Sequence, residues 1–138
     1  MKMAETSIAE LIFDKKESIL YMKIKEKSEM NLENTKEHYE VIKNLTENKR
    51  YAALIDTEFY FTADTEALEY ASMPEIVSKR IASAYYNSSL ANMLTTNFFK
   101  VNYKPQLHIE QFKIKEEALE WLRAKVKADK KLIPKAYM

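Results

Sequence analysis

The sequence predicts an α/β domain built around a mostly parallel sheet, and three observations support this class. Runs of β-forming residues alternate with segments of helical period, in the order β-β-α-β-α-β-α-β-α. Residues 51–56 form a continuous apolar run, which is typical of a strand buried on both faces. Residues 8–13 and 18–25 flank a short charged turn, as in a β-hairpin. We therefore expect a mixed sheet that begins with an antiparallel hairpin and is flanked by four helices.

The first helix is predicted over residues 31–48, where the period becomes helical. Asn31 or Asn34 can cap its start through a side-chain oxygen. The chain contains no glycine, so asparagine has to take the left-handed positions at which helices end, and Asn48 and Asn102 occupy such places. The lack of glycine also excludes a phosphate-binding loop and a dinucleotide-binding fingerprint.

A second helix is predicted over residues 64–72, directly before a proline. The helix is predicted to restart after this point, at Ser72, Pro74 and Glu75. A capping residue, an early proline and a closing glutamate together suit a new helix N-terminus.

The second half of the chain continues the alternation of strand and helix. We expect a strand at 81–86, a helix from 87 or 88 to 101, a strand at 107–112 and a helix at 114–126. The helix ending at residue 101 carries a stripe that is typical of packing on a sheet: Leu90, Met93, Leu94, Asn97, Phe98 and Val101. We expect a single domain over 1–127, followed by a basic, solvated tail at 128–138.

Composition restricts the classes of function. Of the 138 residues, 22 are basic and 21 acidic, a balance that leaves no basic stripe for nucleic acid. The apolar share of 46% suits a packed core, and no apolar run approaches the length of a membrane span. The chain has no cysteine, which excludes disulfide and thiol chemistry. Without a signal-peptide pattern, the expected location is the cytoplasm.

The sequence contains no recognisable catalytic constellation. Its two histidines, His38 and His108, lie far apart and have no cysteine to complete a metal site. No serine lies in a nucleophile elbow. We therefore expect a non-enzymatic protein that uses no cofactor and no metal.

The junction between the central strand and the helix after it carries the clearest functional signal. Asp56 ends the strand, an aromatic loop follows, and Asp64 and Thr65 begin the helix. Such junctions in α/β sheets present backbone donors and side chains to a partner. Two interpretations follow: a phospho-acceptor switch at Thr65, or a simple N-cap supplied by Thr62 or Asp64.

This junction and the order of elements resemble the STAS-type domains of anti-sigma-factor antagonists, which have the SpoIIAA-like fold. In that family a strand ends in Asp, and an Asp-Ser pair begins the next helix, where a kinase partner phosphorylates the serine. The resemblance implies that Asp56 is the strand-end acid, Asp64 the acid before the switch residue and Thr65 the switch residue. The chain departs from the family motif at Glu66 and Ala67, where the motif continues with a glycine.

Further segments resemble an uncharacterised bacterial family of SpoIIAA-like proteins, labelled STAS-like or, after the lipid-transfer fold, CRAL-TRIO-like. The segments that carry this resemblance are 67–70, 81–87, 90–99, 104–105 and 116–122. The order Asn-Phe-Phe, Lys-Pro, Glu-Ala-Leu-Glu-Trp-Leu marks the family. The resemblance implies the STAS-like fold and no particular activity.

A group of aromatic residues provides a second candidate surface: Tyr85, Tyr86, Phe98, Phe99 and Tyr103. Residues 81–99 contain no charged side chain, although 31% of the chain is charged. Phe98 and Phe99 point about 100° apart on a helix, so one can line a groove or an interface while the other packs inward. Packing of these rings in the core is the competing interpretation.

Together, these features favour a regulatory protein that binds an unidentified partner protein without catalysis. One alternative is a binder of an apolar small molecule or lipid in a groove beside the helix at 88–101. Another is a homodimeric scaffold that associates through the aromatic surface, because uncharged aromatic surface is typical of the centre of an interface.

Overall fold

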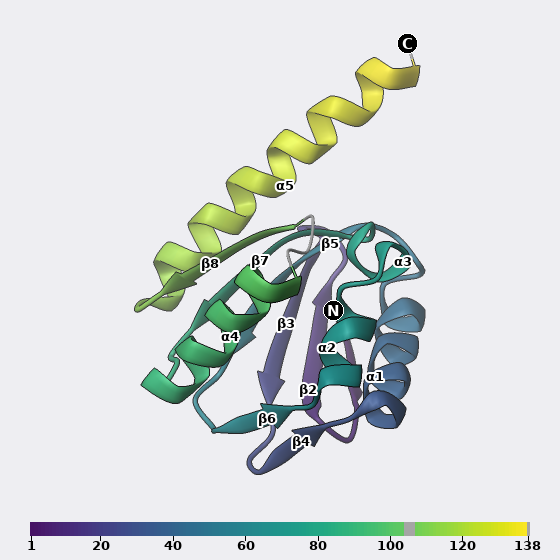
Figure 1. Cartoon of the computed structure of the whole chain (residues 1–138). Helices are drawn as coiled ribbons and strands as arrows, with labels where there is room; N and C mark the ends of the chain where they lie inside the picture. The colour runs from purple at the N-terminus through teal and green to yellow at the C-terminus, as the bar shows by residue number, and fades with distance from the viewer. Residues whose placement is uncertain (104–106, 138) are drawn as a thin grey trace.

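The computed structural model describes residues 1–103 and 107–137, and of residues 103 and 132–137 it describes the backbone alone. Six strands form one sheet in the order β1-β2-β3-β5-β7-β8 (Figure 1). The strands are β1 (Lys2–Glu5), β2 (Ala9–Asp14), β3 (Ile19–Ile24), β5 (Tyr51–Asp56), β7 (Arg80–Tyr86) and β8 (His108–Phe112). β1, β2 and β3 pair antiparallel, whereas β3, β5, β7 and β8 pair in parallel. The predicted mixed, mostly parallel α/β fold is confirmed.

The described residues add short elements that the sequence pattern did not predict. β4 (Ser28–Met30) and β6 (Phe61–Ala63) form a separate two-stranded parallel sheet, and β1 extends the hairpin by one strand. Three or four residues are too few for a period to be recognised. The part of the chain that the structure describes forms five helices, where four were predicted: α1 (Leu32–Leu45), α2 (Thr65–Ala71), α3 (Pro74–Val77), α4 (Leu90–Tyr103) and α5 (Lys115–Tyr137).

Two of the predicted helix ends are correct. Asn31 and Asn34 form a capping box at the start of α1, in which each side chain accepts from the other's backbone N–H. Asn48 is left-handed, with φ 58°, two residues beyond the C-cap Thr46. Asn102 is not a left-handed terminus, because it lies within α4 and its side chain donates to the carbonyl of Phe98.

The predicted cap at Ser72 is wrong. Ser72 ends α2 as its C-cap, where its hydroxyl donates to the carbonyl of Glu69 at 2.8 Å. Met73 precedes α3 and makes no side-chain capping bond. A serine that bonds backwards to the preceding helix is not available to cap the next one.

The last helix does not stop near residue 126. α5 continues to Tyr137 and therefore crosses the position at which a solvated tail was expected to begin. Asp129 on α5 accepts two hydrogen bonds from Arg50, at 2.7 Å from Nη2 and 3.1 Å from Nε. This bidentate ion pair holds the helix against the start of β5, which explains part of its length.

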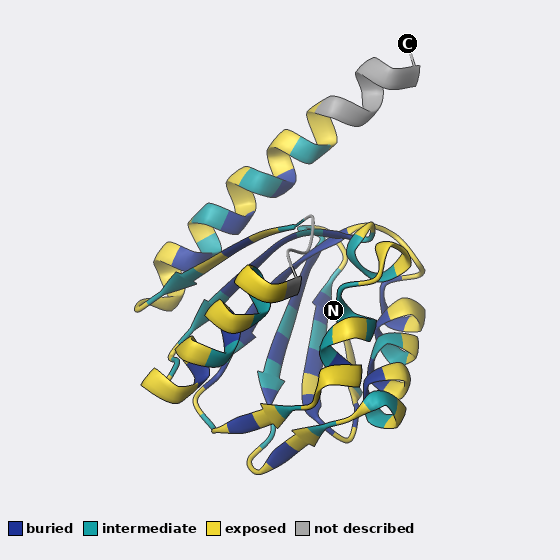
Figure 2. Ribbon diagram, viewed as in Figure 1, coloured by how far each residue is buried: buried dark blue, intermediate teal, exposed yellow. Residues whose placement is uncertain are grey.

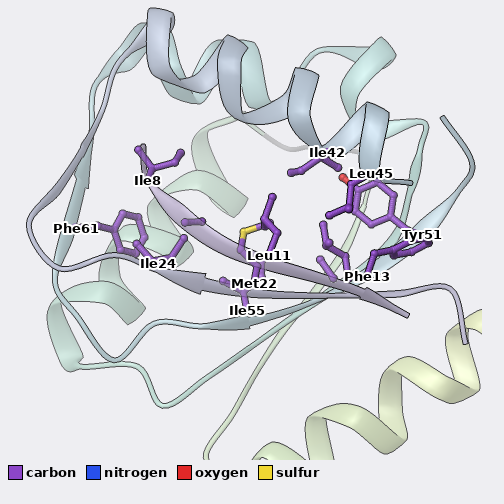
Figure 3. Packing of buried hydrophobic residues seen from close by; sticks show 13 residues of the cluster. Ile8, Leu11, Phe13, Met22, Ile24, Ile42, Leu45, Tyr51, Ile55 and Phe61 are labelled. Atoms are coloured by element: carbon purple, nitrogen blue, oxygen red, sulfur yellow. The ribbon is translucent and has the colours of Figure 1, made fainter. Parts of the chain in front are cut away.

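Two hydrophobic clusters lie on opposite faces of the sheet. Along β5, Tyr51, Ala53 and Ile55 belong to the cluster beneath α1, whereas Ala52 and Leu54 belong to the cluster beneath α5. Successive side chains of a strand point to opposite faces, so one apolar run can supply both clusters. Figure 3 shows the first cluster, where Ile42 and Leu45 of α1 approach the residues of β2, β3 and β5.

Candidate functional site

Asp56 closes the loop after β5 onto the end of β7. Its Oδ1 accepts from the backbone N–H of Glu58 at 3.0 Å and from Nδ2 of Asn87 at 3.4 Å. Its Oδ2 accepts from the hydroxyl of Tyr86 at 3.5 Å. Burial, together with the negative charge of Asp56, raises the pKa of Tyr86 to about 12, so this hydroxyl remains a donor. The hydrogen bonds of Asp56 to groups of the same chain therefore hold the loop after β5 in place.

Asp64 and Thr65 begin α2, as predicted. Asp64 is the N-cap, and its Oδ1 accepts from the backbone N–H of Ala67 at 2.9 Å. Thr65 is the first helical residue, and its side chain is exposed. β6 separates Asp56 from Asp64, and among the described residues the two acids share no hydrogen-bond partner. The structure thus assigns capping to Asp64, not to Thr62, which lies in β6.

The inner face of α4 is polar and fixes the helix to the loop after β5. Asn92 is fully buried, and its Nδ2 donates to the carbonyls of Thr57 at 2.9 Å and Phe59 at 2.8 Å. Its Oδ1 accepts from the backbone N–H of Phe61 at 3.4 Å. The hydroxyls of Thr57 and Ser88 form a further hydrogen bond beside it. These contacts join the two regions that the sequence marks as functional candidates.

The apolar stripe of α4 points away from the sheet, which is the reverse of the prediction. Every residue of the predicted packing stripe is exposed; Leu90, Leu94 and Phe98 keep 73%, 61% and 53% of their surface. We call Leu90, Met93, Leu94, Phe98 and Val101 the α4 outer face. In Figure 2 the side of α4 that faces away from the sheet is coloured largely as exposed. A helix that buries asparagine and threonine while exposing leucine and phenylalanine is inverted relative to ordinary amphipathic packing.

The aromatic residues that were grouped by sequence do not share one surface. Tyr85 packs against the cluster beneath α1, whereas Tyr86 packs on the opposite face with the cluster beneath α5. Adjacent residues of a strand point to opposite faces, so these two rings could not emerge together. Phe98 lies on the α4 outer face, while Phe99 is half-buried and lines a cavity. The side chain of Tyr103 lies outside the described residues.

A cavity of about 90 Å³ lies between α4 and the helices α2 and α3, over the same face of the sheet as α1. Its walls are largely apolar, including Leu68, Val77, Phe99 and Ile109. Among the described residues that line it, one is a cation: Arg80, the first residue of β7, which is 9% exposed. Neither Arg80 nor Asn92 was singled out from the sequence. The available signals were an arginine opening an otherwise apolar strand and an asparagine within an uncharged helix.

The two histidines lie apart and serve local roles. Nδ1 of buried His38 is 3.0 Å from the hydroxyl of Thr6, and Nδ1 of exposed His108 is 2.7 Å from Nζ of Lys125. Within the described part of the chain, no three His, Asp or Glu side chains gather closely enough to hold a metal ion. None of the described helices combines the length and the apolar character that crossing a membrane requires.

The protein has an α/β fold of the SpoIIAA-like type. A solved structure with this fold, an uncharacterized protein of the DUF3478 family from Shewanella loihica PV-4, aligns with a TM-score of 0.58. The alignment covers 88% of this chain and 98% of that one, at 17% sequence identity. A likeness at this identity establishes the fold.

A family model described as a domain of unknown function, DUF7793, matches residues 13–125. The chain therefore belongs to the DUF7793 family. The comparison with curated proteins found no match. Of the resemblances drawn from the sequence, these comparisons support the SpoIIAA-like fold and add no support for the finer STAS-like or CRAL-TRIO-like assignment.

Proposed function

We propose that this protein is a non-enzymatic binding protein that acts through contact with another protein chain, as the SpoIIAA-like resemblance implies. The observation that carries the proposal is the inverted orientation of α4, which exposes a continuous apolar stripe. Scattered single apolar residues are ordinary on protein surfaces, but an aligned set on one helix face is typical of an interaction site. The helix spans 14 residues, or about 20 Å, enough to support a helix-to-helix contact.

The occupant that we propose for the α4 outer face is a second copy of the chain. Residues 81–99 carry no charge, so two such faces can meet without like-charge repulsion. Two copies related by a two-fold axis would pack the stripes of their α4 helices against each other. The contact would remove from water the apolar side chains that the monomer leaves exposed.

The buried hydrogen bonds of Asn92 support the proposal that the α4 outer face is the binding surface. Asn92 satisfies its amide group inside the protein, so the helix is held in the orientation that exposes its apolar stripe. Turning the helix inward would leave the carbonyls of Thr57 and Phe59 without their donor. The hydrogen bonds of Asn92 therefore favour the orientation of α4 in which its apolar stripe is exposed.

Sedimentation velocity at micromolar concentration tests the second copy as occupant. We expect a dimer for the unmodified chain and a monomer for Leu94→Glu, because the introduced charge would be desolvated in the contact. Tyr60→Glu is the matched control, since Tyr60 is 57% exposed but lies outside α4; it should remain dimeric. An unmodified chain that stays monomeric would overturn the proposal of a second copy.

Photo-crosslinking in the cell tests the surface itself. A photoreactive amino acid at position 94 should give an adduct of twice the chain mass, and one at position 60 should not. An adduct of a different mass at position 94 would reject self-association. No adduct at position 94 beyond that at position 60 would reject the α4 outer face as a protein-binding surface.

The alternative function, binding of an apolar molecule beside α4, has its own observation in the cavity lined by Phe99. Small-molecule pockets usually measure several hundred Å³. A cavity of about 90 Å³ is too small for a whole lipid. Any ligand held there without movement of α4 is therefore small.

A further inference from the structure

Arg80 is a buried cation whose charge is not balanced within the described residues. It forms none of the ion pairs in that part of the chain, and no acidic residue there is buried. Its Nη1 donates to the hydroxyl of Ser83 at 2.6 Å, and its guanidinium carbon lies 5.0 Å from the ring centroid of Tyr51. Its Nε is buried and has no hydrogen-bond partner there. An unpaired buried charge is costly, so a native protein that keeps one has a reason for it.

The tyrosines around Arg80 do not supply the missing negative charge. Burial raises the pKa of Tyr39 to about 12, and burial also raises the pKa of Tyr85. Both hydroxyls therefore stay neutral at physiological pH. They surround the guanidinium with aromatic and polar groups without balancing it.

A β-bulge aims Arg80 into the cavity. Tyr51 of β5 pairs with Arg80, and Ala53 pairs with Ser83, so three steps along β7 match two along β5. Regular alternation would place Arg80 and Ser83 on opposite faces of the sheet, but the extra residue brings both to the cavity face. Bulges commonly re-aim side chains next to functional sites.

We propose that the cavity binds a small carboxylate with an apolar tail, its carboxylate on Arg80 and its tail among the apolar side chains of α2, α3 and α4. The unpartnered Nε offers a donor to one carboxylate oxygen, and arginine suits planar, charge-assisted pairing with this group. The tail would contact Leu68, Val77 and Phe99. Partly exposed residues on several elements line the cavity, Leu68, Val77 and Phe99 among them, so a tail too long for the volume of about 90 Å³ would extend past them toward solvent.

Calorimetric titration of the whole chain with butanoate, hexanoate and octanoate tests this site. Hexanol supplies the same tail without the charge, and inorganic phosphate supplies charge without a tail. We expect hexanoate to bind at least about tenfold more tightly than hexanol, as for a hydrogen bond to a buried charged group. Phosphate should bind more weakly than hexanoate.

Variants of the chain locate the binding. Arg80→Met replaces the charged guanidinium with an unbranched apolar side chain. It should abolish the preference for hexanoate over hexanol. Arg50→Met is the matched control, because exposed Arg50 pairs with Asp129 outside the cavity and should keep the preference. If Arg80→Met does not fold, Ala71→Leu narrows the cavity from α2 and should weaken octanoate more than butanoate.

Three results would overturn the proposal, and none depends on whether the protein dimerises. They are equal affinities for hexanoate and hexanol in the unmodified chain, no binding of any carboxylate at millimolar concentration, and phosphate binding as tightly as hexanoate. The last result would indicate a site for anions in general, with no role for the apolar walls.

Discussion

Individual buried polar side chains connect parts of this protein that are far apart in sequence. Asn92 bonds to two carbonyls of the loop after β5, more than thirty positions earlier in the chain. Thr6 and His38 form another such pair, between the end of β1 and α1. Each of these contacts satisfies a group that would be costly to bury alone, so each restricts how its element can be oriented.

Because His38 is buried, we expect the free energy of unfolding to fall in acid. Burial lowers its pKa from 6.5 to about 3, and the positive charge of Arg80 contributes further. Between these values the unfolded chain binds more protons than the folded one. The free energy of unfolding is therefore fully maintained above about pH 6.5 and falls toward pH 3 by up to roughly 1.4 kcal/mol per pH unit.

Urea unfolding at a series of pH values measures this effect. In His38→Gln the dependence on pH should be shallower over that window, because glutamine cannot take up the proton. His108→Gln, which removes the exposed histidine, is the comparison variant. Equal slopes for His38→Gln and the unmodified chain would contradict the assignment.

Asp64 and Thr65 can be separated by experiment. Asp64→Ala should lower the free energy of unfolding by about 1 kcal/mol, because the backbone N–H of Ala67 loses its acceptor.

If Thr65 is also a switch, incubation in a lysate of the protein's own cells should add the mass of one phosphate. Thr65→Ala should abolish that addition, and an unmodified mass would leave the pair as a helix cap alone.

At the scale of elements, α4 differs from the other long helices. α1 and α5 bury apolar residues such as Ile42 and Leu122, whereas among the described side chains of α4 the fully or nearly fully buried ones are Asn92 and Thr96. Hydrophobic burial supplies most of the stability of a packed helix. We therefore expect apolar burial to contribute less to the stability of α4 than to that of α1 or α5.

We expect the amide hydrogens of α4 to exchange well before those of β5. Hydrogen exchange followed by mass spectrometry, on Leu94→Glu so that dimerisation does not protect the helix, compares residues 90–101 with residues 52–55. Local opening is favoured where few apolar contacts are lost. Equal protection of the two segments would show that α4 is as firmly packed as the central strand.

At the scale of the whole molecule, the two cores share one sheet. Leu11 lies in the cluster beneath α1 and Leu122 in the cluster beneath α5, and adjacent residues of β5 contribute to both. Loss of either layer would expose one face of the central strand. The two layers should therefore unfold together.

Leu11→Ala and Leu122→Ala should each lower the free energy of unfolding by about 2–5 kcal/mol. Met3→Ala is the control, since Met3 is 78% exposed and should change stability by less than about 0.5 kcal/mol. The single tryptophan, Trp121 on α5, reports one layer by fluorescence, and far-UV circular dichroism reports all elements. A fluorescence transition at lower urea than the dichroism transition would show that α5 unfolds independently.

The sequence by itself determined the fold class and the central elements. The apolar run of β5 was recognisable from local pattern, which also restricted the cap of α1 to Asn31 or Asn34 and the cap of α2 to Thr62 or Asp64. The structure then showed a capping box formed by both asparagines and a cap by Asp64. Periodicity also showed which residues of α4 share a face. It could not show which way that face points, because the orientation depends on contacts of Asn92 with a distant loop.

Only the tertiary structure decided the rest. It turned the apolar stripe of α4 outward, placed Tyr85 and Tyr86 on opposite faces and extended α5 through its ion pair with Arg50. It also aimed Arg80 into a cavity through a bulge that is visible only once β5 and β7 are paired. These features depend on contacts between residues far apart in the chain, and a local pattern contains no information about such contacts.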